Sequence, residues 1–130
     1  MPGQWAVQTA LGGVQSIYEL TAPTGRLGRQ RHALMQTLAQ SRFLTAEKPD
    51  GALYAFIGVR TEGLGAFDDA KFAMTLLERQ HVLVVPGSSF NVDYKNRFRI
   101  TFLPDVETLA VAIHRIEATL AEWNQSSAEP

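Results

Sequence analysis

The sequence contains no cysteine and no long apolar run. Without cysteine the chain can form no disulfide bond, no thiolate metal site and no cysteine nucleophile. No stretch approaches the roughly 18 apolar residues that a membrane-spanning helix needs. Residues 1–7 also lack the basic segment followed by an apolar segment that marks a signal peptide. We therefore expect a soluble, cytoplasmic protein with no membrane partner.

The chain also lacks an excess of either charge. Its 12 Lys and Arg face 13 Asp and Glu, which gives a formal net charge of -1. Binding of nucleic acid by counterion release needs a basic surface, so we expect no nucleic-acid partner. The closest basic cluster is Arg26, Arg29 and Arg31. At this helical spacing we interpret it as a solvated helix face.

The residue patterns of common catalytic sites are also missing. His32, His81 and His114 show no metal-ligand spacing, so we expect no metal site. Ser88 and Ser89 lie outside the GxSxG pattern of a nucleophile elbow, and we interpret them as turn residues that satisfy local backbone groups. The sequence has no glycine-rich phosphate loop.

The chain does have the material for one domain with a substantial core. Of its 130 residues, 45% are hydrophobic. A globular chain of this length buries roughly two thirds of the surface that its unfolded form exposes. We expect residues 1–124 to form one domain. The small polar residues of 125–130 predict a disordered tail.

Hydrophobic residues at helical spacing predict helices over residues 4–20, 24–40, 69–80 and 106–123. Gly12 and Gly13 interrupt the first, and each costs a helix interior about 1 kcal/mol relative to alanine. Aspartate favours the N-cap position because its side chain accepts a free backbone N–H. We expect Asp68 or Asp69 to cap the third helix and Asp105 to cap the fourth.

Short runs of apolar, β-branched and aromatic residues predict strands over residues 43–46, 53–59, 82–85 and 97–103. A tight turn is expected at Pro49–Gly51 and a loop over Gly58–Gly65. In the last strand Phe98, Ile100 and Phe102 alternate with polar residues. This order predicts an α+β fold, a two-layer sandwich in which a small mixed or antiparallel sheet carries helices on one face.

Arg99 is the most informative polar residue of that sheet. It lies between the core residues Phe98 and Ile100 and therefore points to the opposite face. A guanidinium group is rigid and forked, and it binds a carboxylate through two parallel hydrogen bonds. The alternative is that Arg97 and Arg99 simply line a solvated sheet face.

Four stretches in order carry a resemblance to a known family: QTALGG at 8–13, KPDGALYAF at 48–56, HVLVVPGSSF at 81–90 and RFRITFLP at 97–104. An amphipathic helix follows them. In this combination the chain resembles the C-terminal small domain of class I/II aminotransferases of fold type I, which depend on pyridoxal phosphate. It is most similar to the bacterial alanine (glutamate–pyruvate) aminotransferases.

The resemblance implies a set of substrate-binding residues. In the family, the arginine of the FRI-to-LP pattern binds the substrate α-carboxylate, and the turn after the buried strand packs beside it. The GALY stretch lies at the mouth of the pocket. The substrate is an amino acid or a 2-oxo acid. Carried onto this sequence, the set comprises Arg99, Gly51, Ala52, Tyr54, Pro86, Gly87 and Phe90.

The resemblance also implies what this chain does not supply. The lysine and acidic residue that hold pyridoxal phosphate belong to the family's large domain, and Lys48, Lys71 and Lys95 do not stand in that context. The stretch 57–67 lacks the proline usual after this strand. Because Met1 falls where the family's sequence is mid-chain, we expect an excised domain of a homodimeric parent, inactive alone.

Two other functions stay open. One is a free-standing binding or interaction module, and the other, less favoured, is an autonomous enzyme, for which no nucleophile, base and orienting group are visible together. Exposure distinguishes the first from a detached domain. A detached domain should expose the contiguous apolar area that met the rest of its parent.

Overall fold

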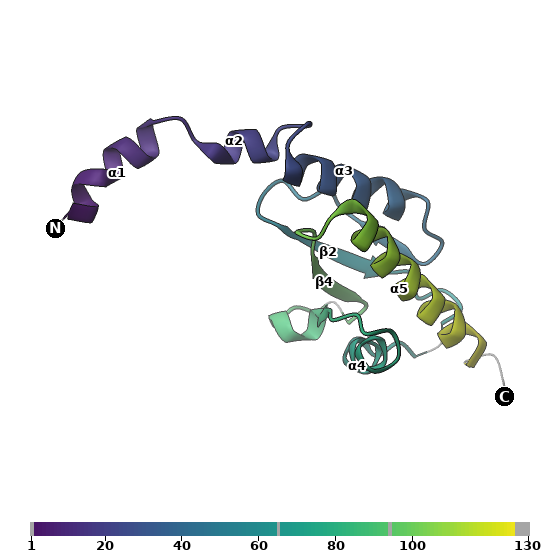
Figure 1. The fold of residues 1–130 in the computed structure, drawn as a ribbon. Helices are drawn as coiled ribbons and strands as arrows, with labels where there is room; N and C mark the ends of the chain where they lie inside the picture. Colours follow the sequence, from purple (N-terminus) through teal and green to yellow (C-terminus); the bar gives the residue numbers. More distant parts are fainter. Residues whose placement is uncertain (1, 65, 94, 127–130) are drawn as a thin grey trace.

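The protein has two layers, a four-stranded sheet and the helices that cover one of its faces (Figure 1). The computed structural model describes residues 2–64, 66–93 and 95–126. The helices are α1 (Pro2–Gly12), α2 (Ser16–Thr21), α3 (Arg26–Ala39), α4 (Asp69–Gln80) and α5 (Val106–Ser126), with a 3₁₀ helix η1 (Gly87–Phe90). The strands are β1 (Leu44–Ala46), β2 (Tyr54–Val59), β3 (Val85–Pro86) and β4 (Arg97–Thr101).

The sheet is antiparallel throughout, in the order β1-β2-β4-β3. Ile57 pairs with Phe98, and the next pair along is Phe56 with Arg99. Because side chains alternate across a strand, these two pairs lie on opposite faces. Ile57 and Phe98 are buried under the helices, which leaves the pair Phe56 and Arg99 on the other face. The predicted α+β sandwich with helices on one face is confirmed.

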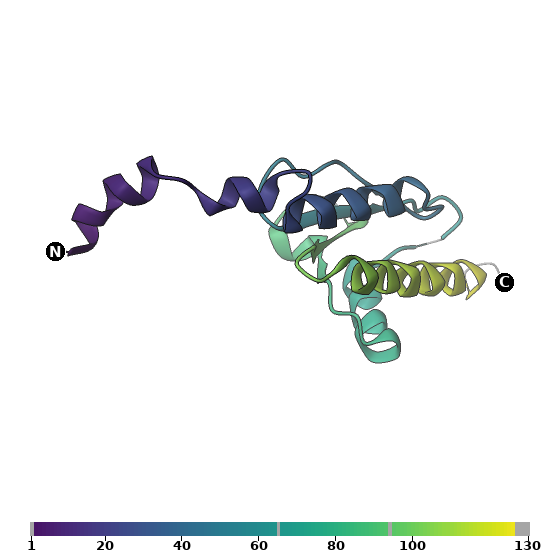
Figure 2. The same ribbon diagram turned by 45° about the horizontal axis from the view of Figure 1, so that its top comes forward.

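The core lies between the sheet and the helices α3, α4 and α5. Helix α5 buries residues three and four positions apart, as its periodicity predicts: Leu109, Ile113, Ile116 and Leu120. It packs against α3 on one side and α4 on the other, and Figure 2 shows α3 and α5 lying over the same side of the sheet. The apolar face of β2 completes this core with Ala55, Ile57 and Val59.

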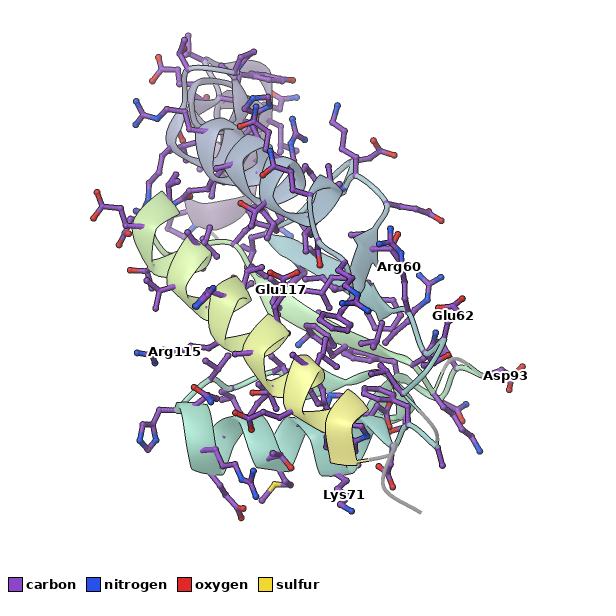
Figure 3. All side chains as sticks on the ribbon, turned by 90° about the vertical axis from the view of Figure 1, so that its right-hand side faces the viewer. Arg60, Glu62, Lys71, Asp93, Arg115 and Glu117 are labelled. Carbon is purple, nitrogen blue, oxygen red and sulfur yellow. The ribbon has the colours of Figure 1, made fainter. Side chains whose placement is uncertain are left out.

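Polar contacts fix α5 against its neighbours. Glu117 of α5 accepts a hydrogen bond from the Ser41 hydroxyl, and the Ser41 oxygen in turn accepts the backbone N–H of Leu44 at 2.9 Å. At the other side, Arg115 donates to the Gln80 carbonyl at the end of α4, at 2.9 Å. Figure 3 shows Glu117 and Arg115 leaving α5 in different directions. These contacts join α5 to the segment before β1 and to the end of α4.

The predicted helix over residues 4–20 is two helices in the structure. It breaks at Gly13–Gln15, beside the glycine pair, and α1 and α2 form an arm that extends away from the sheet and helices (Figures 1 and 2). Helix α1 has no buried residue. Trp5 is 86% exposed and Val14 is 96% exposed. The arm therefore presents its apolar side chains to solvent.

Helix α2 returns to the body by packing against α3. Gly28 of α3 makes this approach possible, because a Cβ atom at this position would lie 1.9 Å from the Ala22 carbonyl oxygen. Any larger side chain would push α2 off α3.

Several boundaries differ from the predicted ones, and β4, for example, ends at Thr101, two residues before the predicted end. The run 82–85 forms a strand only at Val85–Pro86, because the chain first ends α4: His81 adopts φ 55° and Val82 donates to the Leu76 carbonyl. The predicted loop at 58–65 begins only after Val59, which still pairs with β1. Helix α5 continues through Ser126, two residues into the predicted tail, and residues 127–130 lie outside the described residues.

Both predicted N-caps form. The Asp68 side chain accepts the Lys71 N–H at 2.9 Å, which makes Asp68, and not Asp69, the cap of α4. Asp105 accepts the Thr108 N–H at 2.8 Å and the Thr108 hydroxyl at 2.9 Å. These bonds, the backbone one first, hold the pKa of Asp105 below its ordinary value of 3.8.

We expect Asp105→Ala to lower the free energy of unfolding at neutral pH. The difference in this free energy between the variant and the unchanged chain should become smaller in acid. A lowered pKa in the folded state means that the ionised cap contributes its full stability above pH 3.8 and loses it as the pH falls through the lower folded value. Urea unfolding of both proteins at neutral and strongly acidic pH measures this. The exposed Asp93→Ala is the control. A difference in unfolding free energy that stays the same at both pH values would contradict the expectation.

Candidate functional site

The open face of the sheet places Arg99 against two aromatic rings. Its guanidinium carbon lies 4.4 Å from the ring centroid of Tyr54 and 4.8 Å from that of Phe90. Cationic guanidinium groups are attracted to the faces of aromatic rings at such distances. Tyr54 and Phe90, two of the predicted site residues, therefore contact Arg99 directly.

Three elements bring these residues together. Strand β2 presents Tyr54 and Phe56 on the open face, and β4 presents Arg99 on the same face because it pairs with Phe56. The turn η1 supplies Phe90, whose ring meets that of Phe56 edge-on at 5.7 Å. Arg97, the other arginine of this face, lies 5.9 Å from the Phe56 ring. Aromatic rings thus surround the arginines on a face that no helix covers.

The N–H groups of Arg99 are available for an anion. Within residues 2–64, 66–93 and 95–126, no carboxylate forms an ion pair with Arg99, and the ion pair that does occur there joins Arg79 and Glu122 at 3.8 Å. Aromatic rings occupy the faces of a guanidinium and leave its in-plane donors free. A planar carboxylate or a phosphate matches that fork of donors.

A buried carboxylate holds the turn that carries Phe90. Asp69, in the first turn of α4, is 5% exposed. Its two oxygens accept the Ser88 backbone N–H at 2.8 Å and the Ser88 hydroxyl at 3.0 Å. The interpretation of Ser88 as a residue that satisfies local backbone groups is therefore wrong, because its partner is on another element. No local spacing signals this pair, whose members are 19 positions apart.

Pro86 and Gly87 lead into this turn, and Pro86 is half-buried. Pro86 pairs with Phe98 at the edge of the sheet, a place that suits a residue without an N–H. Gly87 is buried at the start of η1. The two residues direct the chain from β3 towards Phe90.

Gly51 and Ala52 lie elsewhere. They line a pocket of about 310 Å³ together with residues of α2 and α3, among them Ile17 and Leu27. Ala52, and not Gly51, takes the left-handed conformation of this turn, with φ 56°. The predicted site is thus in two parts, with Tyr54 as the member of the GALY stretch that reaches Arg99.

The described residues do not form a pyridoxal phosphate site. Lys48, Lys71 and Lys95 are all exposed. Lys71 borders a groove of about 510 Å³ between α4 and α5, where its amino group lies 5.7 Å from the Trp123 ring, and it points outward in Figure 3. That groove is on the helix side of the sheet, opposite Arg99. An enclosed lysine with an acidic partner, which the cofactor requires, is not provided by these three residues.

The described residues also contain no group of three or more His, Asp or Glu that could hold a metal ion. Among the helices that they form, none has both the length and the apolar character needed to cross a membrane.

Comparison with known proteins identifies the family of the chain. The family model for aminotransferase class I and II matches residues 1–116. The chain therefore belongs to the class I and II aminotransferase family, whose members generally use pyridoxal phosphate.

Within the family, the chain is similar to alanine aminotransferases. It is 38% identical over 125 residues to the glutamate-pyruvate aminotransferase AlaA of Haemophilus influenzae, covering 96% of this chain and 31% of that protein. It is equally identical, at 38%, to the alanine aminotransferase of Mycobacterium tuberculosis, covering 29% of that protein. The predicted resemblance is confirmed, and the chain spans about a third of the length of these relatives.

A solved structure shows the same fold. An aminotransferase from Escherichia coli superimposes with a TM-score of 0.82 and 36% sequence identity, over 93% of this chain and 30% of that one.

Proposed function

We propose that this chain is the substrate-clamping domain of a pyridoxal-phosphate-dependent aminotransferase. The parent enzyme transfers an amino group between an amino acid such as alanine or glutamate and a 2-oxo acid. Arg99 binds the α-carboxylate of either substrate. The observation that carries the proposal is the position of Arg99, beside Tyr54 and Phe90 on the one face of the sheet that no helix covers.

The substrates explain why an arginine is needed there. Amino acids and 2-oxo acids share a carboxylate next to the reacting carbon. A forked guanidinium holds a carboxylate in one plane through two hydrogen bonds. This fixes the position of the reacting carbon relative to the cofactor that the rest of the parent would supply. The aromatic rings of Tyr54 and Phe90 restrict the guanidinium before the substrate arrives. The chain thereby orients the substrate, and the rest of the parent supplies the cofactor and its lysine.

The exposed arm supports a larger parent. Trp5, Leu11 and Val14 are each at least three-quarters exposed, and exposed apolar side chains are expected where a domain has been separated from its partner. We propose that this arm packs against the large domain of the same chain, that residues 1–124 form the small domain, and that the parent is a cytoplasmic homodimer.

A domain graft tests the proposal. We expect a chimera in which this chain replaces the matching segment of Haemophilus influenzae AlaA to bind pyridoxal phosphate, seen as its visible absorption band, and to form alanine from pyruvate and glutamate. The AlaA enzyme without its own segment is the control and should not be active. The isolated chain should show neither the band nor the activity.

Two results would contradict the proposal. One is a chimera that binds the cofactor but forms no alanine. The other is an isolated chain with a stoichiometric cofactor band that disappears when Lys48, Lys71 or Lys95 is replaced.

A further inference from the structure

We infer that Asp69 is a positioning residue for Arg99. By holding Ser88, its carboxylate fixes the turn η1 and thereby places the Phe90 ring against the Arg99 guanidinium. The inference rests on the proposed function in one respect, since the consequence for substrate binding requires that Arg99 bind the carboxylate. Its structural part, the link from Asp69 to Arg99, stands on the contacts alone.

The contact between Asp69 and Ser88 joins a buried carboxylate to an exposed turn residue. Asp69 is 5% exposed, yet both of its oxygens accept hydrogen bonds from a serine that is itself exposed. Burial of a carboxylate is unfavourable unless such bonds compensate it. The start of α4 also favours a negative charge, because the free N–H groups of a helix point there. The buried Asp69 side chain is therefore held in place, and it restrains the exposed Ser88.

The restraint reaches Phe90 through a very short path. Ser88 is two residues before Phe90, within a single turn of 3₁₀ helix. Such turns have poor internal hydrogen-bond geometry and depend on outside contacts. Pro86, paired with the sheet, holds one end of the turn, and Asn91 leaves it in a left-handed conformation with φ 53°. Ser88 is the link between these ends and α4.

Phe90 in turn limits where Arg99 can point. Its ring lies 4.8 Å from the guanidinium and also contacts the Phe56 ring edge-on, so Phe90 packs against both strands of the open face. A group restrained before its ligand arrives loses less freedom on binding. Without the Asp69 contact, we expect Arg99 to keep its charge but to lose this restraint. Substrate affinity would then fall while the chemical step changes little.

The structural part is tested by NMR on the isotope-labelled full chain. The side-chain N–H of Arg99 lies beside aromatic rings, so ring currents shift its resonance. We expect Asp69→Asn and Ser88→Ala each to move this resonance towards its position in a flexible chain. The double variant should move it no further than the larger single change, because both act through one contact. The controls are Asp68→Asn, which changes the neighbouring cap, and Ser89→Ala, which changes the neighbouring exposed serine.

The functional part is tested in the AlaA chimera. We expect Asp69→Asn and Ser88→Ala to raise the KM for glutamate and for pyruvate by about three- to tenfold, with kcat within about twofold. The two controls should leave KM within about twofold of the parent chimera. A residue that only stabilised α4 would lower the melting temperature and leave both the Arg99 resonance and KM unchanged.

Each outcome decides a separate question. Ser88→Ala removes the hydroxyl bond and keeps the backbone bond to Asp69, so an Arg99 resonance that is unmoved in both Ser88→Ala and Asp69→Asn overturns the inference. If Asp69→Asn does not fold, Asp69→Glu, which keeps the charge and displaces the carboxylate, takes its place. A moved resonance with unchanged KM also overturns the positioning role if Arg99→Ala does raise KM. If Arg99→Ala leaves KM unchanged, it is the proposed function that fails, and the link from Asp69 to Arg99 is judged by the resonance alone.

Discussion

Replacing Arg99 with alanine in the AlaA chimera will lower kcat/KM for glutamate and for alanine by at least about tenfold. A hydrogen bond to a charged group contributes about 1.5–3 kcal/mol, and loss of that amount from the transition state corresponds to roughly 10- to 150-fold in kcat/KM. The value of kcat/KM should fall for both substrates because the carboxylate is the group that they share. Steady-state kinetics at saturating co-substrate measures the effect, and the cofactor band verifies that the variant is folded.

The neighbouring arginine supplies the matched control. Arg97 lies on the same strand and the same open face, two residues away, beside the ring of Phe56. We expect Arg97→Ala to change kcat/KM by less than about threefold. If the two arginines merely line a solvated face, the two substitutions will have equal and small effects. Arg99→Lys keeps the charge but not the fork, and should resemble Arg99→Ala more than the parent.

The face occupied by Arg99 could be predicted because a strand's alternation is a local property. Phe98 and Ile100 flank the arginine in sequence, and a period of two sends their side chains to the opposite side. The structure confirms this: Phe98 is 1% exposed in the core. The N-caps were predictable for the same reason, since Asp68 and Asp105 bond to backbone groups only three residues away.

The contacts that complete the site could not be predicted in this way. Asp69 looks in sequence like a second candidate for the cap of α4, and Ser88 looks like a turn serine. Their contact depends on how α4 is placed beside η1, which the whole sheet and helix layer decide. The resemblance placed Phe90 near the arginine, but only the fold shows that α4 holds its turn.

The division of the predicted site has a similar cause. The GALY stretch was treated as one unit, but the chain changes direction inside it. Ala52 takes a left-handed conformation, after which β2 begins at Tyr54. The residues before that point face α2 and α3, and only Tyr54 joins the open face. The sequence predicts the turn at Pro49–Gly51, and the left-handed residue is instead Ala52, a residue type that rarely adopts this conformation.

The arm shows the limit of hydrophobic periodicity. Apolar residues at helical spacing predict a helix, and α1 and α2 are helical. The same pattern does not say what the helix packs against. Helix α1 buries none of its side chains within the described chain, so a helical pattern here does not imply a packing partner.

Replacing Phe72 with alanine will cost the chain a large part of its stability. Phe72 is fully buried in α4, and its ring lies 5.2 Å from Phe67, 5.9 Å from Phe98 and 5.8 Å from Trp123. Truncation of a buried phenylalanine to alanine destabilises proteins by about 3–5 kcal/mol, through lost burial and the cavity that remains. Most small domains have only about 5–15 kcal/mol in total. Urea unfolding followed by far-ultraviolet circular dichroism measures the loss.

The control is Met74→Ala on the same helix, where the side chain is 54% exposed and the expected change is within about 0.5 kcal/mol. The cavity in Phe72→Ala opens directly behind Phe98, the residue next to Arg99 on β4. A variant that still folds should therefore also broaden or shift the Arg99 side-chain resonance, whereas Met74→Ala should not. Equal losses of stability in the two variants would mean that the aromatic cluster does not support the sheet, and with it the rigid placement of Arg99.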